Sequence, residues 1–158
     1  MLIKKILIGI DDSKFAENAA QYGFDIAHKF NAAVGVVHIV EPMIMPYSNT
    51  GDPLLGASDL SMVPDVDVLD AQNKASQSLV DRTIEKFADG MEVTHFSEFG
   101  NTANGIIDCS KEFGADLIVI GTHSRSGIDR LLMGSVAEHV VRHSEVPVLV
   151  VPLVEKGS

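Results

Sequence analysis

A chain of 158 residues with a hydrophobic fraction of 46% and no tryptophan fits one ordinary α/β domain with a substantial core. Its formal net charge of −10 argues against a nucleic-acid surface, which requires clustered lysine and arginine. A mononucleotide is not excluded, because backbone N–H groups can hold its phosphates. The sequence has a single cysteine, Cys109, and no apolar run of the roughly 20 residues that a membrane span needs. Its N-terminal apolar run is too short for a signal peptide. These features predict a cytoplasmic protein.

Predicted strands and helices alternate along the chain. Apolar, β-branched runs predict five strands, at residues 2–10, 32–40, 91–96, 115–120 and 147–151. Apolar residues at three- and four-residue steps predict helices between them. The first includes Ala16 to Phe30, the second spans about 67–87, the third follows its cap and includes Ile106 to Phe113, and the fourth follows Ser135 and runs to about His143. Asp12 or Ser13 caps the first helix, and Asn101 or Thr102 caps the third.

One connection is unusually long. Residues 41–66 contain four prolines and two glycines, which break regular structure, yet they remain largely apolar. A loop of this length and composition predicts a lid or a contact surface. The whole chain, 1–158, is predicted to form a single domain.

Several residues of reactive types are explained by packing. His38 lies inside the second strand, and we interpret it as a satisfied core or strand-end histidine and not as a ligand. Cys109 shares a helical pattern with core residues, which predicts a buried thiol. His139 and His143 lack the glutamate of a zinc-protease helix, so we interpret them as surface or interface histidines.

The alternation of strands and helices predicts a single doubly wound parallel sheet with helices on both faces. Such sheets bind ligands beyond the carboxyl ends of the strands, where the strand order reverses. Asp11, Ile39 and Gly121 stand at or near the ends of the first, second and fourth strands. If the first and fourth strands are neighbours, these three residues converge on one crevice.

The connection after the fourth strand carries the strongest functional signal. It leaves the strand at Gly121 and enters a helix at Gly134, and glycines at both ends permit sharp turns and close approach. Ser135 and Glu138 have the spacing of a capping box. Free N–H groups at Gly134, Ser135 and Val136, with the helix dipole, predict a phosphate site. A helix cap without any ligand explains the Gly134-Ser135 pair alone equally well.

The segment from Gly121 to Val151 resembles the C-terminal signature of the universal stress protein family. Members that bind ATP carry a glycine, two residues, a second glycine, nine residues, and then Gly-Ser or Gly-Thr. Gly121, Gly134 and Ser135 match this pattern, whereas Ser124 stands at the second glycine position. Residues 6–13 and 115–121 extend the similarity, which covers nearly the whole chain.

The resemblance implies a five-stranded parallel sheet in the order 3-2-1-4-5, of the adenine-nucleotide α-hydrolase-like type, and a homodimer. It also implies a bound adenine nucleotide: ATP, or ADP or AMP, with Mg²⁺. The positions that correspond to nucleotide contacts are Gly9, Ile10, Asp11, Ile39, Ile120, Gly121, His123, Ser124, Arg125, Gly134, Ser135 and Val136. Among these, Ile39 is expected to pack on the adenine and Gly134, Ser135 and Val136 to hold the phosphates.

Two of these positions have alternative interpretations. Asp11 fits a ribose-hydroxyl acceptor or an outer ligand of a metal-bound triphosphate, but it also fits an acid that caps the first helix. Ser124 either offers its hydroxyl to a phosphate, helped by Arg125 and Ser126, or shifts the loop and closes the site. We expect nucleotide binding to be retained.

Other classes of protein fit less well. Asp11 and Asp12 resemble the acidic pair of a phosphoacceptor receiver domain, but residues 95–99 supply no aspartate at the end of the third strand. There is no Gly-x-Gly-x-x-Gly after the first strand, no nucleophile elbow and no carboxylate pair placed for acid–base work. Because no catalytic base is evident, we expect slow ATP hydrolysis at most.

Two hypotheses therefore remain. The first is a nucleotide-binding module that acts as a homodimeric regulator in a stress response, and the second is a dimeric interaction protein of the same fold that binds no nucleotide. The last strand is apolar and is expected at the sheet edge, where it would pair with its own copy. That strand comprises Pro147, Val148, Leu149, Val150 and Val151. The rival is that the tail after it folds back over the edge.

Overall fold

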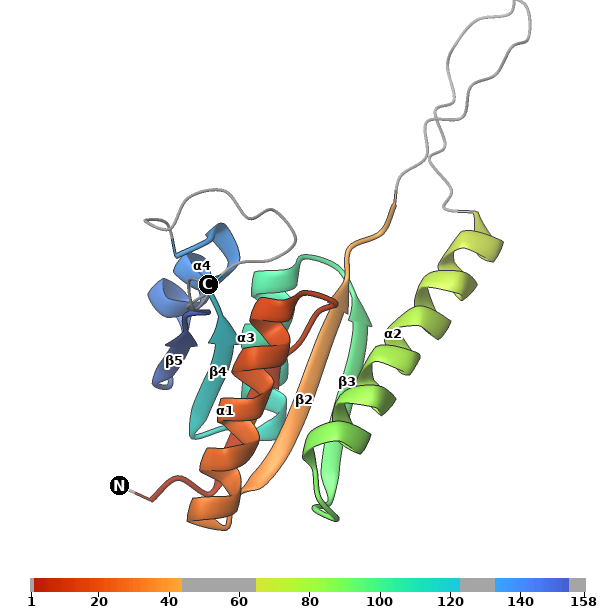
Figure 1. The fold of residues 1–158 in the computed structure, drawn as a ribbon. Helices are drawn as coiled ribbons and strands as arrows, with labels where there is room; N and C mark the ends of the chain where they lie inside the picture. Colours follow the sequence, from red (N-terminus) through yellow and green to blue (C-terminus); the bar gives the residue numbers. More distant parts are fainter. Residues whose placement is uncertain (1, 44–64, 123–132, 154–158) are drawn as a thin grey trace, which may run out of the picture.

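The computed structural model describes residues 2–43, 65–122 and 133–153. These residues form nine elements in alternating order (Figure 1). In chain order they are β1 (Lys5–Gly9), α1 (Lys14–Phe30), β2 (Ala33–Val40), α2 (Val66–Phe87), β3 (Val93–Phe99), α3 (Thr102–Phe113), β4 (Leu117–Gly121), α4 (Ser135–His143) and β5 (Val148–Val151). Most of the 41–66 loop that the sequence predicts as a lid or contact surface lies outside the described residues.

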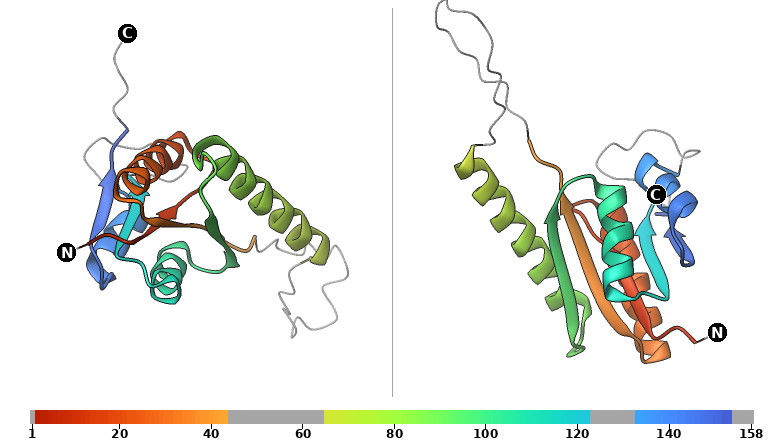
Figure 2. Two further views of the ribbon diagram at one scale, coloured as in Figure 1. Left: turned by 90° about the horizontal axis from the view of Figure 1, so that it is seen from below. Right: turned by 180° about the vertical axis from the view of Figure 1, so that it is seen from behind.

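The sheet has five strands, all parallel, in the order β3-β2-β1-β4-β5. β1 is central: Ile6 is paired with Val34 of β2 on one side and with Leu117 of β4 on the other. Helices cover both faces (Figure 2). The predicted doubly wound sheet and its strand order are therefore confirmed.

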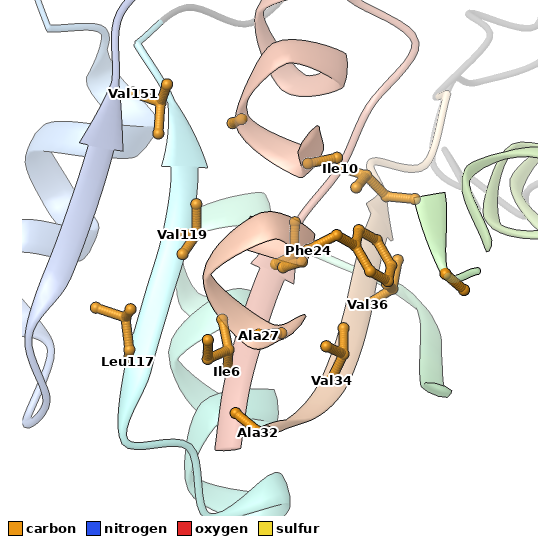
Figure 3. Close-up of a cluster of buried hydrophobic side chains, with 14 of the residues drawn as sticks. Ile6, Ile10, Phe24, Ala27, Ala32, Val34, Val36, Leu117, Val119 and Val151 are labelled. Carbon is orange, nitrogen blue, oxygen red and sulfur yellow. The ribbon is translucent and has the colours of Figure 1, made fainter. Parts of the chain in front are cut away.

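Two hydrophobic clusters fill the space between the sheet and the helices. On the α1 and α2 face, Phe24 of α1 is 1% exposed and stacks on Phe87 of α2, with ring centroids 6.0 Å apart. Ile6 and Val119 face the same cluster from the sheet (Figure 3). Alternation of side chains along each strand explains why both faces of the sheet are apolar.

The second cluster lies on the α3 and α4 face and contains Leu7, Ile118 and Cys109. Cys109 is 1% exposed, which confirms the predicted buried thiol. Burial, together with the negative charge of nearby carboxylates such as Glu98, raises the pKa of this thiol to about 12. The thiol is therefore protonated at neutral pH and serves as a small apolar side chain.

The helix caps resolve the alternatives left open by the sequence. Ser13 caps α1, because its hydroxyl accepts a hydrogen bond from the Ala16 amide at 3.2 Å. Asn101 caps α3 in the same way through the Asn104 amide at 3.0 Å. No helix among the described residues is long and apolar enough to cross a bilayer.

Several predicted strand boundaries differ from the structure by one to three residues, and the end of the third strand is the most informative of these corrections. The third strand was predicted to end at residue 96, but β3 continues to Phe99. The reason is backbone pairing: β2 is long, and its last residue, Val40, is still paired with Phe99. Pairing with a neighbour holds the polar Ser97 and Glu98 in extended conformation, although they break the apolar pattern.

Phe24 offers a direct test of the α1–α2 packing. Phe24→Ala is expected to lower the free energy of unfolding by about 3–5 kcal/mol, because it removes a fully buried ring and leaves a cavity. The matched control is Phe30→Ala on the same helix, where the ring is 53% exposed and the expected change is within about 0.5 kcal/mol. Urea denaturation of both variants measures the difference, and equal losses would contradict this packing.

Candidate functional site

A cavity of about 460 Å³ opens at the edge of the sheet where β1, β2 and β4 end. The beginnings of α3 and α4 and one side of α2 complete its walls. Its volume is in the range of small-molecule sites, which is roughly 300–1,000 Å³. Its position, beyond the carboxyl ends of parallel strands, is where doubly wound folds hold ligands.

The residues after β1 form one wall of the cavity. The Ile10 amide donates to the Val37 carbonyl at 2.9 Å, which holds this wall on β2. Asp11 lines the cavity, and its Oδ1 accepts a hydrogen bond from the Ser13 amide at 2.7 Å. Asp11 thus supports the residue that caps α1 without being the cap itself, and its carboxylate stands at the cavity wall. Its role toward a ribose or a metal-bound triphosphate stays a prediction.

The start of α4 forms the opposite wall. Gly134 is the N-cap and has φ 87° and ψ 146°, a conformation that is essentially restricted to glycine. The predicted capping box is wrong. The helix starts one residue earlier than the box requires, so Ser135 is the first helical residue and not the N-cap, and Glu138 pairs with Arg142 at 2.9 Å.

The corrected cap has a chemical consequence. No side chain of the described residues caps α4, and the first amides of a helix have no partner within the helix itself. Gly134, Ser135, Val136 and Ala137 all line the cavity. The positive end of the α4 dipole therefore faces this space, which is the arrangement that stabilises an anion.

Glycines allow the strand ends to pack closely beneath the cavity. A Cβ added at Gly121 would lie 2.8 Å from the carbonyl oxygen of Phe15, in the first turn of α1. A Cβ at Gly9 would lie 2.9 Å from Cγ2 of Ile120. Side chains at Gly9 and Gly121 would therefore separate β1, β4 and α1 at this point.

The end of β2 is apolar on one side. Ile39 lines the cavity but is only 6% exposed, and a Cβ at Gly105 of α3 would lie 2.5 Å from its Cδ1. Ile39 is thus mainly a core residue whose edge reaches the cavity. That edge provides an apolar surface on which an aromatic ring can pack.

Sequence reasoning missed the wall that α2 contributes. Its members follow the helical spacing and are Gln72, Ala75, Ser76, Leu79 and Arg82. Ser76 is 1% exposed, and its hydroxyl lies 2.6 Å from His38 Nδ1 and 2.6 Å from Ser97 Oγ. His38 is accordingly hydrogen-bonded, as predicted, and it also lines the cavity. The sequence contains no distinctive signal for this wall, because Gln72 and Ser76, four apart on one face of a helix, have the same pattern as a solvent-exposed face.

A further cluster joins three elements at the rim. Glu41, just after β2, accepts hydrogen bonds through Oε1 from the hydroxyl of Thr102 at 2.9 Å and from its amide at 3.4 Å. The side-chain nitrogen of Gln72 donates to the backbone carbonyl of Glu41 at 3.3 Å. The end of β2 is thereby tied to the starts of α3 and α2.

The structure brings most of the predicted nucleotide-contact residues to this one cavity. Those that line it are Gly9, Ile10, Asp11, Ile39, Ile120, Gly121, Gly134, Ser135 and Val136. His123, Ser124 and Arg125 lie outside the described residues. Within the part of the chain that the structure describes, no group of three or more metal-ligating side chains is present.

The two histidines of α4 lie away from the cavity lining. Their rings stack with centroids 4.1 Å apart, and His139 Nε2 lies 3.0 Å from Asn104 Oδ1 of α3. His143 is exposed, and its Nδ1 lies 2.8 Å from the His139 carbonyl. The polar contact of His139 therefore joins α4 to α3, and that of His143 lies within α4.

The fold and site are those of a doubly wound α/β protein with a small-molecule cavity at the strand ends. The chain matches the Universal stress protein family over residues 2–152, and it therefore belongs to that family. It is 33% identical over 150 residues to universal stress protein MJ0531 of Methanocaldococcus jannaschii, an alignment that covers 95% of this chain and 82% of the relative. The family resemblance noted in the sequence is confirmed.

Solved structures agree on the fold. A universal stress protein UspA from Lactobacillus plantarum superposes with a TM-score of 0.74 at 23% identity, covering 96% of this chain and 99% of that chain. A universal stress protein in complex with cAMP has a TM-score of 0.63 at 24% identity, with coverages of 96% and 98%. One from Archaeoglobus fulgidus in complex with dAMP has a TM-score of 0.62 at 21% identity, with coverages of 95% and 98%.

The start of α4 gives a test of the corrected cap. Gly134→Ala is expected to lower the free energy of unfolding by about 1–3 kcal/mol, because alanine is strained at this positive φ. Ser135→Ala is expected to change it by less than about 0.5 kcal/mol, because Ser135 makes no cap. Chemical denaturation of the two variants measures both effects. A larger loss of stability for Ser135→Ala than for Gly134→Ala would instead support the capping box.

Proposed function

We propose that this protein binds an adenine nucleotide, with ATP favoured, in the cavity at the ends of β1, β2 and β4. The observation that carries the proposal is the convergence of uncapped α4 amides, the Asp11 carboxylate and the apolar edge of Ile39 on one cavity. These three features match the phosphate, ribose and base of a nucleotide in that order along the sheet. The complexes of related structures with cAMP and dAMP support the same ligand class.

The charge of the ligand fits the chemistry of the site. Phosphates are favoured at the start of α4, where backbone N–H groups and the helix dipole provide positive charge. Mg²⁺ in nucleotide sites is held by the phosphates together with one or two carboxylates. Asp11 is the residue here that fits an outer ligand of such an ion, or an acceptor for a ribose hydroxyl.

We propose a regulatory role in a stress response, with ATP hydrolysis slow at most. A nucleotide regulates without being hydrolysed when it binds one conformation more tightly than another and so shifts their populations. The second candidate is a dimeric interaction protein of the same fold whose cavity holds no nucleotide. The binding experiment below separates the two.

The nucleotide proposal is tested by calorimetry. The full-length protein is expected to bind ATP·Mg²⁺, and Asp11→Asn to weaken binding by about threefold to tenfold through loss of a charged acceptor. Asp11→Asn keeps an oxygen that can accept from the Ser13 amide. Asp108→Asn, on an exposed part of α3, is the matched control and is expected to bind like the wild type. No heat with ATP·Mg²⁺ at millimolar concentration would favour the second candidate.

We also propose a homodimer built on β5. Among the described residues β5 pairs with β4 alone, so its other edge is open, and three of its four side chains, those of Val148, Leu149 and Val150, are only partly buried. The carbonyl of Pro152 accepts a hydrogen bond from Asn18 of α1 at 3.3 Å, so the chain leaves the strand toward α1. Pairing with a second copy about a twofold axis would satisfy the open edge of both strands.

Light scattering tests the dimer. The wild type is expected to be dimeric at tens of micromolar, and Val148→Lys or Val150→Lys to give a monomer or an aggregate, because a charge is placed in the apolar contact. Val66→Lys is the control, since Val66 is 74% exposed on α2, far from β5 along the sheet order. A wild-type monomer at that concentration would refute this interface.

A further inference from the structure

The α2 wall of the cavity contains a polar atom that lacks a partner. Oε1 of Gln72 is buried and accepts no hydrogen bond, and it is the one buried side-chain nitrogen or oxygen of the described residues in this state. Buried acceptors are rarely left unpaired, because desolvation is then not compensated. Gln72 lines the cavity, so a donor group on a molecule in that space would complete its hydrogen bonding.

The orientation of the Gln72 amide follows from its neighbour. The backbone carbonyl of Glu41 can only accept a hydrogen bond, so the Gln72 atom that faces it at 3.3 Å is the nitrogen. Glu41 is itself held by the hydroxyl and amide of Thr102. The oxygen of Gln72 is therefore an acceptor fixed in place by the end of β2 and the start of α3.

The nearest polar side chain on the same face of α2 does not compete for this acceptor. Ser76, one turn further along the helix, is already engaged at 2.6 Å with His38 on one side and with Ser97 on the other. A serine hydroxyl has one proton to donate, and both of these partners lie at hydrogen-bond distance. The unpaired acceptor at Gln72 thus remains for a ligand.

The position of Gln72 selects which part of a nucleotide it meets. α4 begins at the end of β4, whereas α2 packs beside β2 and β3 and lines the other side of the cavity (Figure 1). The ends of β2 and β4 are two strand spacings apart, about 10 Å. A nucleotide with its phosphates at α4 and its ribose beside Asp11 therefore extends its base toward Gln72.

We propose that Gln72 determines base specificity by accepting a hydrogen bond from the 6-amino group of adenine. Adenine carries an N–H donor at C6, whereas hypoxanthine and guanine carry a carbonyl oxygen there. An oxygen at that place would face the oxygen of Gln72, and neither group could donate. This inference rests on the proposed function, which supplies the adenine nucleotide, and it adds the residue that distinguishes its base.

The test compares ligands and variants in one set of calorimetric titrations. The ligands are ATP, its analogue with hydrogen in place of the 6-amino group, and inosine triphosphate. The wild type is expected to bind ATP about fivefold to tenfold more tightly than the 6-hydrogen analogue, the value of one net hydrogen bond, and to bind inosine triphosphate no better than that analogue. Gln72→Met is expected to bind ATP and the 6-hydrogen analogue equally.

A matched control distinguishes base recognition from a general effect on α2. Gln77 lies on the same helix, is exposed, and donates to Asp81 Oδ1 at 3.0 Å. Gln77→Met is therefore expected to retain the full preference for ATP. Circular dichroism checks that both variants are folded. The comparison of the three ligands on the wild type tests the preference for the 6-amino group without any variant.

The outcomes separate this inference from the proposed function. If the wild type binds no adenine nucleotide, the proposed function fails and the role of Gln72 fails with it. If the wild type binds ATP and the 6-hydrogen analogue equally, nucleotide binding stands and the role of Gln72 is overturned. If Gln72→Met instead removes a preference for ATP over 2′-deoxy-ATP, the acceptor recognises the ribose and the assignment to the base is overturned.

Discussion

The structure depends on the central strand β1 being paired on both edges and covered on both faces. Ile6, Leu7 and Ile8 are completely buried, and the strand is bonded to β2 and β4 over most of its length. A strand held in this way cannot shift along its neighbours without exposing its apolar side chains on the wrong face. The ends of the three strands are therefore fixed relative to one another, and with them the base of the cavity.

Close packing at these ends explains part of the glycine pattern. Gly121 is required by the backbone of Phe15 and Gly9 by the side chain of Ile120, whether or not a ligand is bound. Gly134 is different, because its positive φ sets the direction in which α4 begins. The glycine pattern in the sequence therefore has two causes. Gly9 and Gly121 are required by close packing, whereas Gly134 is required by the backbone conformation at the start of α4, which lines the cavity.

Much of the fold could be predicted because its signals are local. Apolar runs and caps such as Ser13 and Asn101 mark elements from their own sequence. The end of β3 could not be predicted, since Ser97 and Glu98 are extended through pairing with β2 and not through their own propensity. The cap of α4 was also missed, because the Ser135–Glu138 spacing of a capping box is correct but the helix begins one residue earlier than that box requires.

The residues of the candidate site also fall into those that could be predicted from the sequence and those that could not. Residues at strand ends, such as Asp11 and Ile39, could be placed because parallel strands end at one edge of the sheet. The α2 wall could not, because polar residues on a helix have the pattern of a solvent-exposed face. Only the packing of α2 on β2 shows that Ser76 is buried beside His38 and that Gln72 faces the cavity.

The cavity lies between two groups of elements that pack on different partners. α4 packs on α3 and β5, whereas α2 packs on β2, β3 and α1. A ligand that binds both the start of α4 and the face of α2 stabilises these two helices against local unfolding. The stabilisation increases with the ratio of the ligand concentration to its Kd. α4 also packs on β5, the edge strand of the sheet. The proposed ligand binding at the strand ends and the proposed association at the β5 edge would therefore be linked through one short helix.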